Sequence, residues 1–385
     1  MNPGVPVAFL QLMKQPRRLL IAVAGIAMSS LGILGQMGFE DSLFRSATRL
    51  FQEFDADIAL LSPQYQFMVL PAQFSERRLY QALSVPGVKS FSSVRLGVAP
   101  FKNPLTRSNR NVYVVGVSRA GDGVVFANDG WQRKTSALRE PDEIVFDARS
   151  RPEFGPIAAL FREGEVHTEI ANQRVRIVEL FAMGASFSAD GTAITTEEGF
   201  ERLFPSRRPG LVDIGLIKIS RGEDVNEVLA RLQAALPADV VAMTHAQLNA
   251  QEQKYWRSTT PAGFIFKTVL ILSLLVGCVS AYQILYSDIS ENLRQYATLK
   301  AIGYPDSFFH RLTFEKAWLL SSLAYPVGFA MAAAVYIGAT QLTLVPLVMT
   351  VERAVGVYII ILSACVVAGL LAIRRLRRSD LSELF

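Results

Sequence analysis

The residues in this sequence that could bind a metal or catalyse a reaction are its histidines, its cysteines and its paired acids. The histidines are far apart in the chain and lack metal-ligand spacing: His167, His245 and His310. Cys278 and Cys365 both fall inside apolar runs, so they are not placed to staple an exported domain or to act as exposed nucleophiles. The adjacent acids Glu197 and Glu198 are typical of a solvated surface. We therefore expect neither a metal site nor a catalytic site.

Longer motifs support this expectation. The sequence contains no G-x-x-x-x-G-K-[ST] loop, no G-x-S-x-G elbow and no H-E-x-x-H pair. The chain therefore lacks a P-loop with which to bind ATP. We expect a protein that is not an enzyme and has no cofactor of its own.

Composition and charge indicate a membrane protein. Half of the residues are hydrophobic, at 50%, and the mean hydropathy is +0.27. Four apolar runs are each about 20 residues long, which is enough to cross a bilayer. A cleaved signal peptide is the alternative for the first run, but its length and the lack of a small-residue exit favour an anchor. Lys267 lies one turn inside the second run, where it could be a buried functional group or could reach the interface.

Basic residues beside the runs predict the topology. They gather on one side of the expected membrane: Lys14, Arg17, Arg18, Arg294, Lys300, Arg311, Lys316, Arg374, Arg375, Arg377 and Arg378. The loop before the fourth run offers only Arg353. The positive-inside rule then predicts a multi-pass membrane protein with both termini in the cytoplasm. The expected segments are a cytoplasmic N-terminus (1–18), a first span (19–38), an outer domain (39–262), a second span (263–286), a cytoplasmic segment (287–316), a third span (317–340), a short outer loop (341–353), a fourth span (354–373) and a basic cytoplasmic tail (374–385).

The outer domain has an α+β pattern. Residues 55–61, 74–83 and 94–99 indicate a β-α-β unit, and residues 211–220, 223–236 and 240–243 indicate a second. Two such units suggest a split ferredoxin-like lobe, with a mostly β lobe inserted at about 100–209. Helical stripes predict a two-helix stalk. One stripe continues the first span: Phe39, Leu43, Ala47, Leu50, Phe51 and Phe54. The other helix begins at a capping box, Thr244 with Gln247.

The stretch 286–306 predicts a short polar helix between the second and third spans. Asp288 and Glu291 have capping-box spacing at its start. Gly303 occupies the place of a left-handed C-cap, and Pro305 follows it. A helix of about a dozen residues is roughly 18 Å long and would lie across the membrane bundle, which suits docking onto a partner. An ordinary loop between two spans is the alternative.

Three stretches carry a resemblance to a known family: residues 211–220, residues 255–304 and the ending 374–385. The sharpest is YATLKAIGY, at 296–304. With these stretches the chain resembles permease subunits of the MacB/FtsX/LolC-type ABC transporters, and among them the DevC-type permeases. Gln295 stands where an acidic residue is expected in that family, and Lys267 stands where a small one is expected.

The resemblance implies four spans, a large periplasmic domain and a homodimer that works on a separate dimeric ATPase, which would bind ATP and Mg²⁺. It implies that Glu291 to Ile302 forms a coupling helix on that ATPase. The implied contact residues are Glu291, Arg294, Tyr296, Leu299, Lys300, Gly303 and Tyr304. Because only about 18 residues precede the first span, we expect the ATPase to be another subunit, similar to DevA.

The resemblance also implies a mechanism and further partners. These are a DevB-like periplasmic membrane-fusion adaptor and a TolC-like outer-membrane channel, with export of a lipid-like or hydrophobic substrate by mechanotransmission. Membrane lipids are expected around the spans, and no nucleic acid is. Two alternatives stay open: an FtsX-like regulator of a periplasmic enzyme that moves no cargo, and a lipoprotein-releasing permease.

Overall fold

The structure is a computed structural model, and it describes residues 13–14, 16–68, 71–118, 125–127, 129–186, 189–343 and 347–378. The chain divides into two compact units. The helical unit comprises Met1–Ser42 and Pro261–Phe385, and the α/β unit comprises Leu43–Thr260. Together they contain four candidate membrane helices and a large α/β domain.

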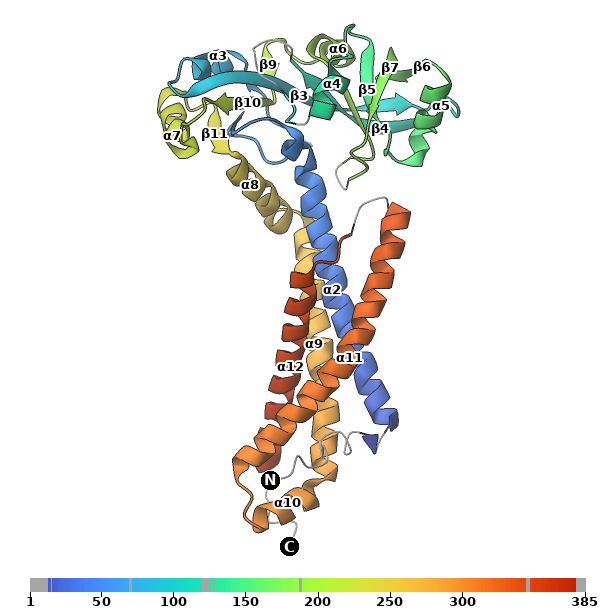
Figure 1. The fold of residues 1–385 in the computed structure, drawn as a ribbon, viewed down its shortest axis with the longest axis vertical. Helices are drawn as coiled ribbons and strands as arrows, with labels where there is room; N and C mark the ends of the chain where they lie inside the picture. The colour runs from blue at the N-terminus through green and yellow to red at the C-terminus, as the bar shows by residue number, and fades with distance from the viewer. Residues whose placement is uncertain are drawn as a thin grey trace. The chain divides into compact units, whose positions relative to one another are not determined.

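Eleven strands are described in the α/β unit: β1 (Ile58–Leu61), β2 (Phe74–Ser75), β3 (Val88–Lys102), β4 (Asn109–Val117), β5 (Glu143–Asp147), β6 (Val166–Ile170), β7 (Gln173–Phe181), β8 (Thr192–Thr196), β9 (Leu211–Val212), β10 (Ile214–Ile219) and β11 (Val241–Thr244). The helices of this unit are α3 (Arg77–Leu83), α4 (Asp129–Thr135), the 3-10 turn η1 (Pro152–Phe154), α5 (Ile157–Glu163), α6 (Glu197–Leu203), α7 (Val225–Ala235) and α8 (His245–Ser258). Figure 1 labels most of them.

The ends of the unit build its first half. The strands run in the order β11-β1-β10-β3 with every neighbour antiparallel, and α3 and α7 cross between them. This is the ferredoxin-like arrangement that the two β-α-β units predict. Alternate residues of a strand face opposite sides of the sheet. Ile58 and Leu60 accordingly pack with α3 and α7, while Ala59 and Leu61 share a core with residues of α2 and α8.

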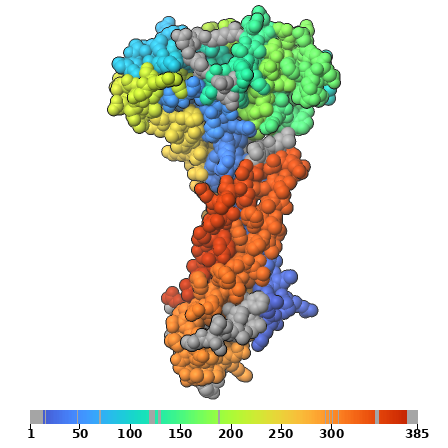
Figure 2. Space-filling model, viewed as in Figure 1, coloured from blue at the N-terminus to red at the C-terminus, as the bar shows by residue number. Residues whose placement is uncertain are grey.

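The second half shares β3 with the first. Fifteen residues long, β3 spans about 50 Å at the usual rise, and its later part pairs with β4. The order continues β4-β8-β5-β7-β6, and β6 returns to pair with Phe101 and Lys102 of β3. The pairing therefore closes on itself around a core that includes Phe101, Phe146 and Phe154. In Figures 1 and 2 the middle of the chain (green) forms this half, while the blue and yellow segments form the other.

This sharing of β3 corrects the expected division of the domain. The region predicted as a separate lobe at about 100–209 begins inside a strand, and nine strands form one sheet. Pro100 predicts a strand end because proline cannot donate a ladder hydrogen bond. In the structure Pro100 lies within β3, opposite Asn111 of β4, and its carbonyl accepts a hydrogen bond from the Ala171 N–H.

The described helices of the helical unit are α2 (Pro16–Glu53), whose last turns belong to the α/β unit, α9 (Pro261–Glu291), α10 (Leu293–Ala301), α11 (Asp306–Thr343) and α12 (Val351–Arg378). Four of them are long and apolar enough to cross a membrane: Pro16–Ser46, Pro261–Glu291, Ser307–Leu342 and Val351–Arg374. Small residues bring α2 and α9 together. A Cβ atom added at Gly25 would lie 2.4 Å from Ser280 Oγ, and Ser29 Oγ donates to the Ser273 carbonyl at 2.6 Å. Close approach at small residues stabilises helix pairs in lipid.

The last turns of α2 pack against α8 within the α/β unit. Leu50, Phe51 and Leu248 are buried in one core, and His245 Nε2 lies 2.8 Å from the Phe51 carbonyl oxygen. The expected capping box of α8 is present. Thr244 Oγ1 accepts a hydrogen bond from the Gln247 N–H, and the Gln247 side-chain oxygen accepts one from the Thr244 N–H. The Ala47 side chain of the predicted stripe lies outside the described residues.

Candidate functional site

The site begins at α10, the short helix between the second and third membrane helices. The Asn292 carbonyl accepts the Tyr296 N–H at 3.0 Å at its start. At its end Gly303 has φ 103°, and the Tyr304 N–H donates back to the Leu299 carbonyl at 3.1 Å. This is the Schellman geometry that a glycine followed by proline predicts. The predicted C-terminus of the helix is therefore confirmed.

The predicted start of this helix is wrong. Asp288 and Glu291 do not form a capping box, because α9 continues through both residues to Glu291 and α10 begins only at Leu293. Asn292 separates the two helices, and its side-chain amide donates to the Asp288 carbonyl at 2.8 Å. Asp288 is free to make a different contact because its neighbours' backbone groups are already paired along α9.

That contact is a buried polar cluster, here named the coupling triad: Asp288, Tyr296 and Lys316. Lys316 of α11 is 1% exposed and forms an ion pair with Asp288 of α9. Its ammonium group also donates to the Tyr296 hydroxyl of α10 at 3.0 Å. Burial, and secondly the charge of Asp288, raise the pKa of Tyr296 well above its usual range, so this phenol stays neutral. The triad ties α10 to both of the long helices that flank it.

A second ion pair joins the end of α9 to the first helix. Arg18 of α2 pairs with Glu291 and also donates to Ser287 Oγ at 2.9 Å. The two side chains are 49% and 39% exposed, so this pair is worth much less than a buried one. The last residue of α9, Glu291, is therefore linked to the start of α2 at the surface of the bundle.

The opposite surface of α10 faces solvent. Arg294, Thr298 and Gly303 are exposed there, and Ile302 and Tyr304 are 70% and 43% exposed. Leu299 is half-buried, and the side chain of Lys300 lies outside the described residues. The structure thus divides the seven predicted contact residues. Arg294, Gly303 and Tyr304 form an open surface with Ile302, whereas Tyr296 points into the bundle because its hydroxyl pairs with Lys316.

Sequence reasoning missed the contributions of Asp288, Lys316 and Arg18 to this site. Lys316 has the same appearance in the sequence as the other basic residues that flank the spans. The one available signal was the type of residue on each side of the gap: an acid at the end of one apolar run and a lysine at the start of the next.

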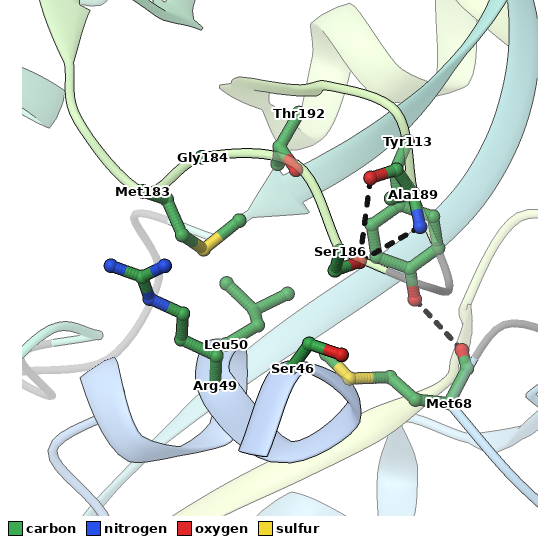
Figure 3. A pocket seen from close by; sticks show the side chains of 10 residues that line it. All are labelled: Ser46, Arg49, Leu50, Met68, Tyr113, Met183, Gly184, Ser186, Ala189 and Thr192. Carbon is green, nitrogen blue, oxygen red and sulfur yellow. Dashed lines mark hydrogen bonds between the residues drawn. The ribbon is translucent and has the colours of Figure 1, made fainter. Parts of the chain in front are cut away.

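A different feature lies in the α/β unit, where the end of α2 meets residues 183–186 and 189–192 (Figure 3). A cavity of about 30 Å³ is lined there by Arg49, Leu50, Tyr113 and Met183, among others. It holds about two water molecules at ~10–15 Å³ each, which is too small for a cargo. The Tyr113 hydroxyl donates to the Met68 carbonyl at 2.7 Å beside it. We interpret this as a packing junction. Among the residues described, no cluster of three potential metal ligands occurs.

Comparison with known proteins assigns the part of the chain that contains α10. Residues 267–381 match the family of FtsX-like permease C-terminal domains. This FtsX-like segment covers α10 and α11, most of α9 and all of the described part of α12. The coupling triad lies entirely within it.

Comparison over more of the chain finds relatives and solved structures of low sequence identity. An uncharacterized ABC transporter permease of Mycobacterium tuberculosis is 24% identical over 69% of this chain, and the chain spans 65% of that relative's length. One from Mycobacterium bovis is 23% identical over 78% of this chain and 74% of its own length. The extracellular domain of the transporter YknZ from Gram-positive bacteria is 10% identical over 49% of this chain and 99% of its own, with a TM-score of 0.32. The periplasmic region of MacB from Actinobacillus actinomycetemcomitans is 6% identical over 54% and 96%, with a TM-score of 0.34.

Proposed function

We propose that this chain is the permease subunit of an ABC-type exporter and that α10 receives the motion of a separate ATPase subunit. The observation that carries the proposal is the match of residues 267–381 to FtsX-like permeases, because it includes α10 and both helices that hold it. ATP and Mg²⁺ are bound by the partner, and this chain performs no chemistry of its own.

The contacts of α10 support its role as a transmitter. A push on its exposed surface reaches α9 through Asp288 and α11 through Lys316, because the coupling triad joins the three helices inside the bundle. Ile302 and Tyr304 offer an apolar contact and Arg294 offers a positive charge. Exposed aromatic and arginine side chains of this kind are typical of interface centres.

The same helices provide a route to the α/β unit. α2 is one helix from Pro16 to Glu53, so it belongs to both units without interruption. Its last turns and α8 form the two-helix stalk of the proposal. Movement of the membrane helices would displace the stalk and change the α/β unit, which is mechanotransmission without passage of cargo through the four spans.

The remaining assignments complete the proposal. The protein is placed in the bacterial inner membrane with both termini in the cytoplasm, as a homodimer of DevC type. A DevA-like ATPase, a DevB-like adaptor and a TolC-like channel are its partners, and the cargo is lipid-like or hydrophobic. The exposed apolar surface of α9, which includes Phe264, Ile271 and Leu275, suits a neighbour in the membrane such as a second copy or lipid.

A detergent pull-down of the tagged chain tests the proposal, with mass spectrometry of the retained proteins. We expect an ABC ATPase and an adaptor. The substitutions Ile302→Asp and Tyr304→Ala should release the ATPase. Leu342→Asp is the matched control, because Leu342 is an 85% exposed apolar residue at the opposite end of α11.

Two results would count against this function. Equal retention of the ATPase by wild type and by Ile302→Asp would exclude α10 as its docking element. Recovery of the ATPase with a periplasmic cell-wall enzyme, in place of an adaptor, would favour a regulator that moves no cargo.

A further inference from the structure

An open groove of about 330 Å³ lies between α2 and α9, within the helical unit. It is at the end of the bundle where α2 begins and α9 ends. Its lining includes Arg18, Ile21 and Ala22 of α2 and Ser280, Gln283 and Ser287 of α9. The volume is at the lower end of the ~300–1,000 Å³ of ordinary ligand sites. The groove can therefore hold a small headgroup with the first part of an acyl chain.

The groove combines three kinds of surface in one line. Ile21 is 70% exposed and apolar, and Arg18 lies about one turn nearer the start of α2. On α9 the polar side chains Ser280, Gln283 and Ser287 are spaced by three and four residues, so they lie on one helix face. An exposed amide such as Gln283 is costly against hydrocarbon unless a hydrogen-bonding group lies beside it.

Charge favours an anion at the mouth of the groove. Lys14 and Arg17 are exposed next to Arg18, and Glu291 is the acid that contacts Arg18. Arg18 uses Nη1 for its bonds to both Ser287 and Glu291. A guanidinium carries five N–H groups, so Arg18 has further donors through which a phosphate can engage it and compete with Glu291. Basic pockets between membrane helices are a known type of site for anionic headgroups.

We propose that the groove between α2 and α9 binds one anionic phospholipid, with its phosphate on Arg18, its glycerol region along Gln283 and Ser287, and an acyl chain over Ile21. This lipid site is separate from the proposed ATPase contact on α10, but the two are close together in the chain. Glu291 is the last residue of α9 and is followed by Asn292 and α10. A lipid phosphate competes with Glu291 for Arg18 and so loosens the link between the first helix and the segment that carries α10.

Native mass spectrometry of the full-length protein measures the binding. The protein is delipidated in detergent and titrated with phosphatidylglycerol or with zwitterionic phosphatidylethanolamine. We expect wild type to prefer phosphatidylglycerol. Arg18→Gln should lower that preference about fivefold, which is the equivalent of about 1 kcal/mol for one cation at a membrane surface. Ile21→Trp should lower it by filling the groove without changing the charge.

Arg17→Gln is the matched control, because it removes the same charge from the neighbouring residue, which does not line the groove. It should lower the preference by less than Arg18→Gln does, because Arg17 adds only long-range charge and makes no contact in the groove. Glu291→Gln should increase the affinity for phosphatidylglycerol, since it removes the competing carboxylate. This gain separates a binding role of Arg18 from a purely structural one.

Three outcomes would overturn the lipid site: no preference for phosphatidylglycerol in wild type, equal losses in Arg17→Gln and Arg18→Gln, or a shift from dimer to monomer in Ile21→Trp with unchanged lipid counts. The last would identify a second copy of the chain as the occupant. The experiment contains no ATPase, so its failure leaves the proposed coupling function untouched. Failure of the ATPase pull-down would likewise leave the lipid result standing.

Discussion

Glu252 of α8 provides the sharpest prediction about the α/β unit. Its side chain is 1% exposed and accepts a hydrogen bond from the Tyr65 hydroxyl at 2.5 Å. Burial raises the pKa of Glu252 from 4.5 to about 7, although the nearby polar groups of Tyr65, the Met68 backbone and Trp256 act in the opposite direction. Burial, and secondly the charge of Glu252, raise the pKa of Tyr65 well above its usual range, so its hydroxyl remains a donor.

The sign of the effect follows from the raised pKa. Between pH 4.5 and 7 the folded protein keeps a proton on Glu252 that the unfolded chain has lost, so the free energy of unfolding decreases as the pH rises through this interval. Above pH 7 the loss is complete, and below 4.5 it is absent. At about 1.4 kcal/mol for each pH unit, the full loss is about 3 kcal/mol.

Glu252→Gln removes this loss, because glutamine resembles the protonated acid and still accepts the Tyr65 hydrogen bond. We expect the variant to be up to about 3 kcal/mol more stable than wild type at pH 8 and equal to it at pH 4.5. For a unit of this size, ~2–4 °C per kcal/mol predicts a rise of up to about 12 °C in the midpoint at pH 8.

Thermal unfolding of the full chain in detergent measures this at both pH values. Trp131 and Trp256 report on the α/β unit by fluorescence, and Trp318 reports on the helical unit. Glu163→Gln, at an exposed glutamate of α5, is the control and should change neither midpoint. If Glu252→Gln shifted the midpoint equally at pH 4.5 and pH 8, the titration of Glu252 would not be the cause.

Three further predictions concern the helical unit. Lys316→Met leaves Asp288 charged and buried, so the variant should lose about 3–5 kcal/mol of the free energy of unfolding, measured with urea. Adding Asp288→Asn should restore most of that stability. A double variant as unstable as Lys316→Met alone would argue against the ion pair. Arg353→Asp breaks the 2.7 Å ion pair with Asp41, and the swap with Asp41→Arg should recover part of the lost thermal stability, whereas additive losses would contradict the pairing. Gly303→Ala places a side chain at φ 103° and should cost about 1 kcal/mol and weaken ATPase retention; unchanged stability would contradict the left-handed cap.

The sequence predicts the elements whose causes are local. The capping box at Thr244 and the left-handed cap at Gly303 depend on residues within four positions of one another, and both form as expected. The strand–helix–strand units at the two ends of the α/β unit are read from residue alternation and turn residues, and they pair in the ferredoxin-like order. Such signals are short-range, so one sequence contains them in full.

The closed half of the sheet depends on long-range pairing and is only partly predicted. β4, β5 and β7 lie in runs whose composition is typical of strands, at residues 111–117, 143–146 and 173–181, within the segment expected to be mostly β. β8, Thr192–Thr196, has three threonines among its five residues and was not expected, yet all five residues are buried. It is buried because it lies between β4 and β5. The composition of β8 does not reveal that position. In the chain β5 lies more than forty residues before β8, and β4 lies more than seventy residues before it.

The site illustrates the same limit with a sharper consequence. Asp288 followed by Glu291 fits a capping box, and the rule fails because capping residues must lie outside the preceding helix. Lys316 lies 28 residues after Asp288 in the chain and pairs with it inside the bundle. This pair decides whether α9 ends before Asp288 or after Glu291. A buried lysine stays charged only beside a partner, so the ion pair and the extra turn of α9 stabilise one another. Extending α9 in this way also places Glu291 next to Arg18, and it leaves α10 held on its inner side by Tyr296 with its outer side open. The open outer surface of α10 therefore follows from one long-range ion pair rather than from the local capping pattern.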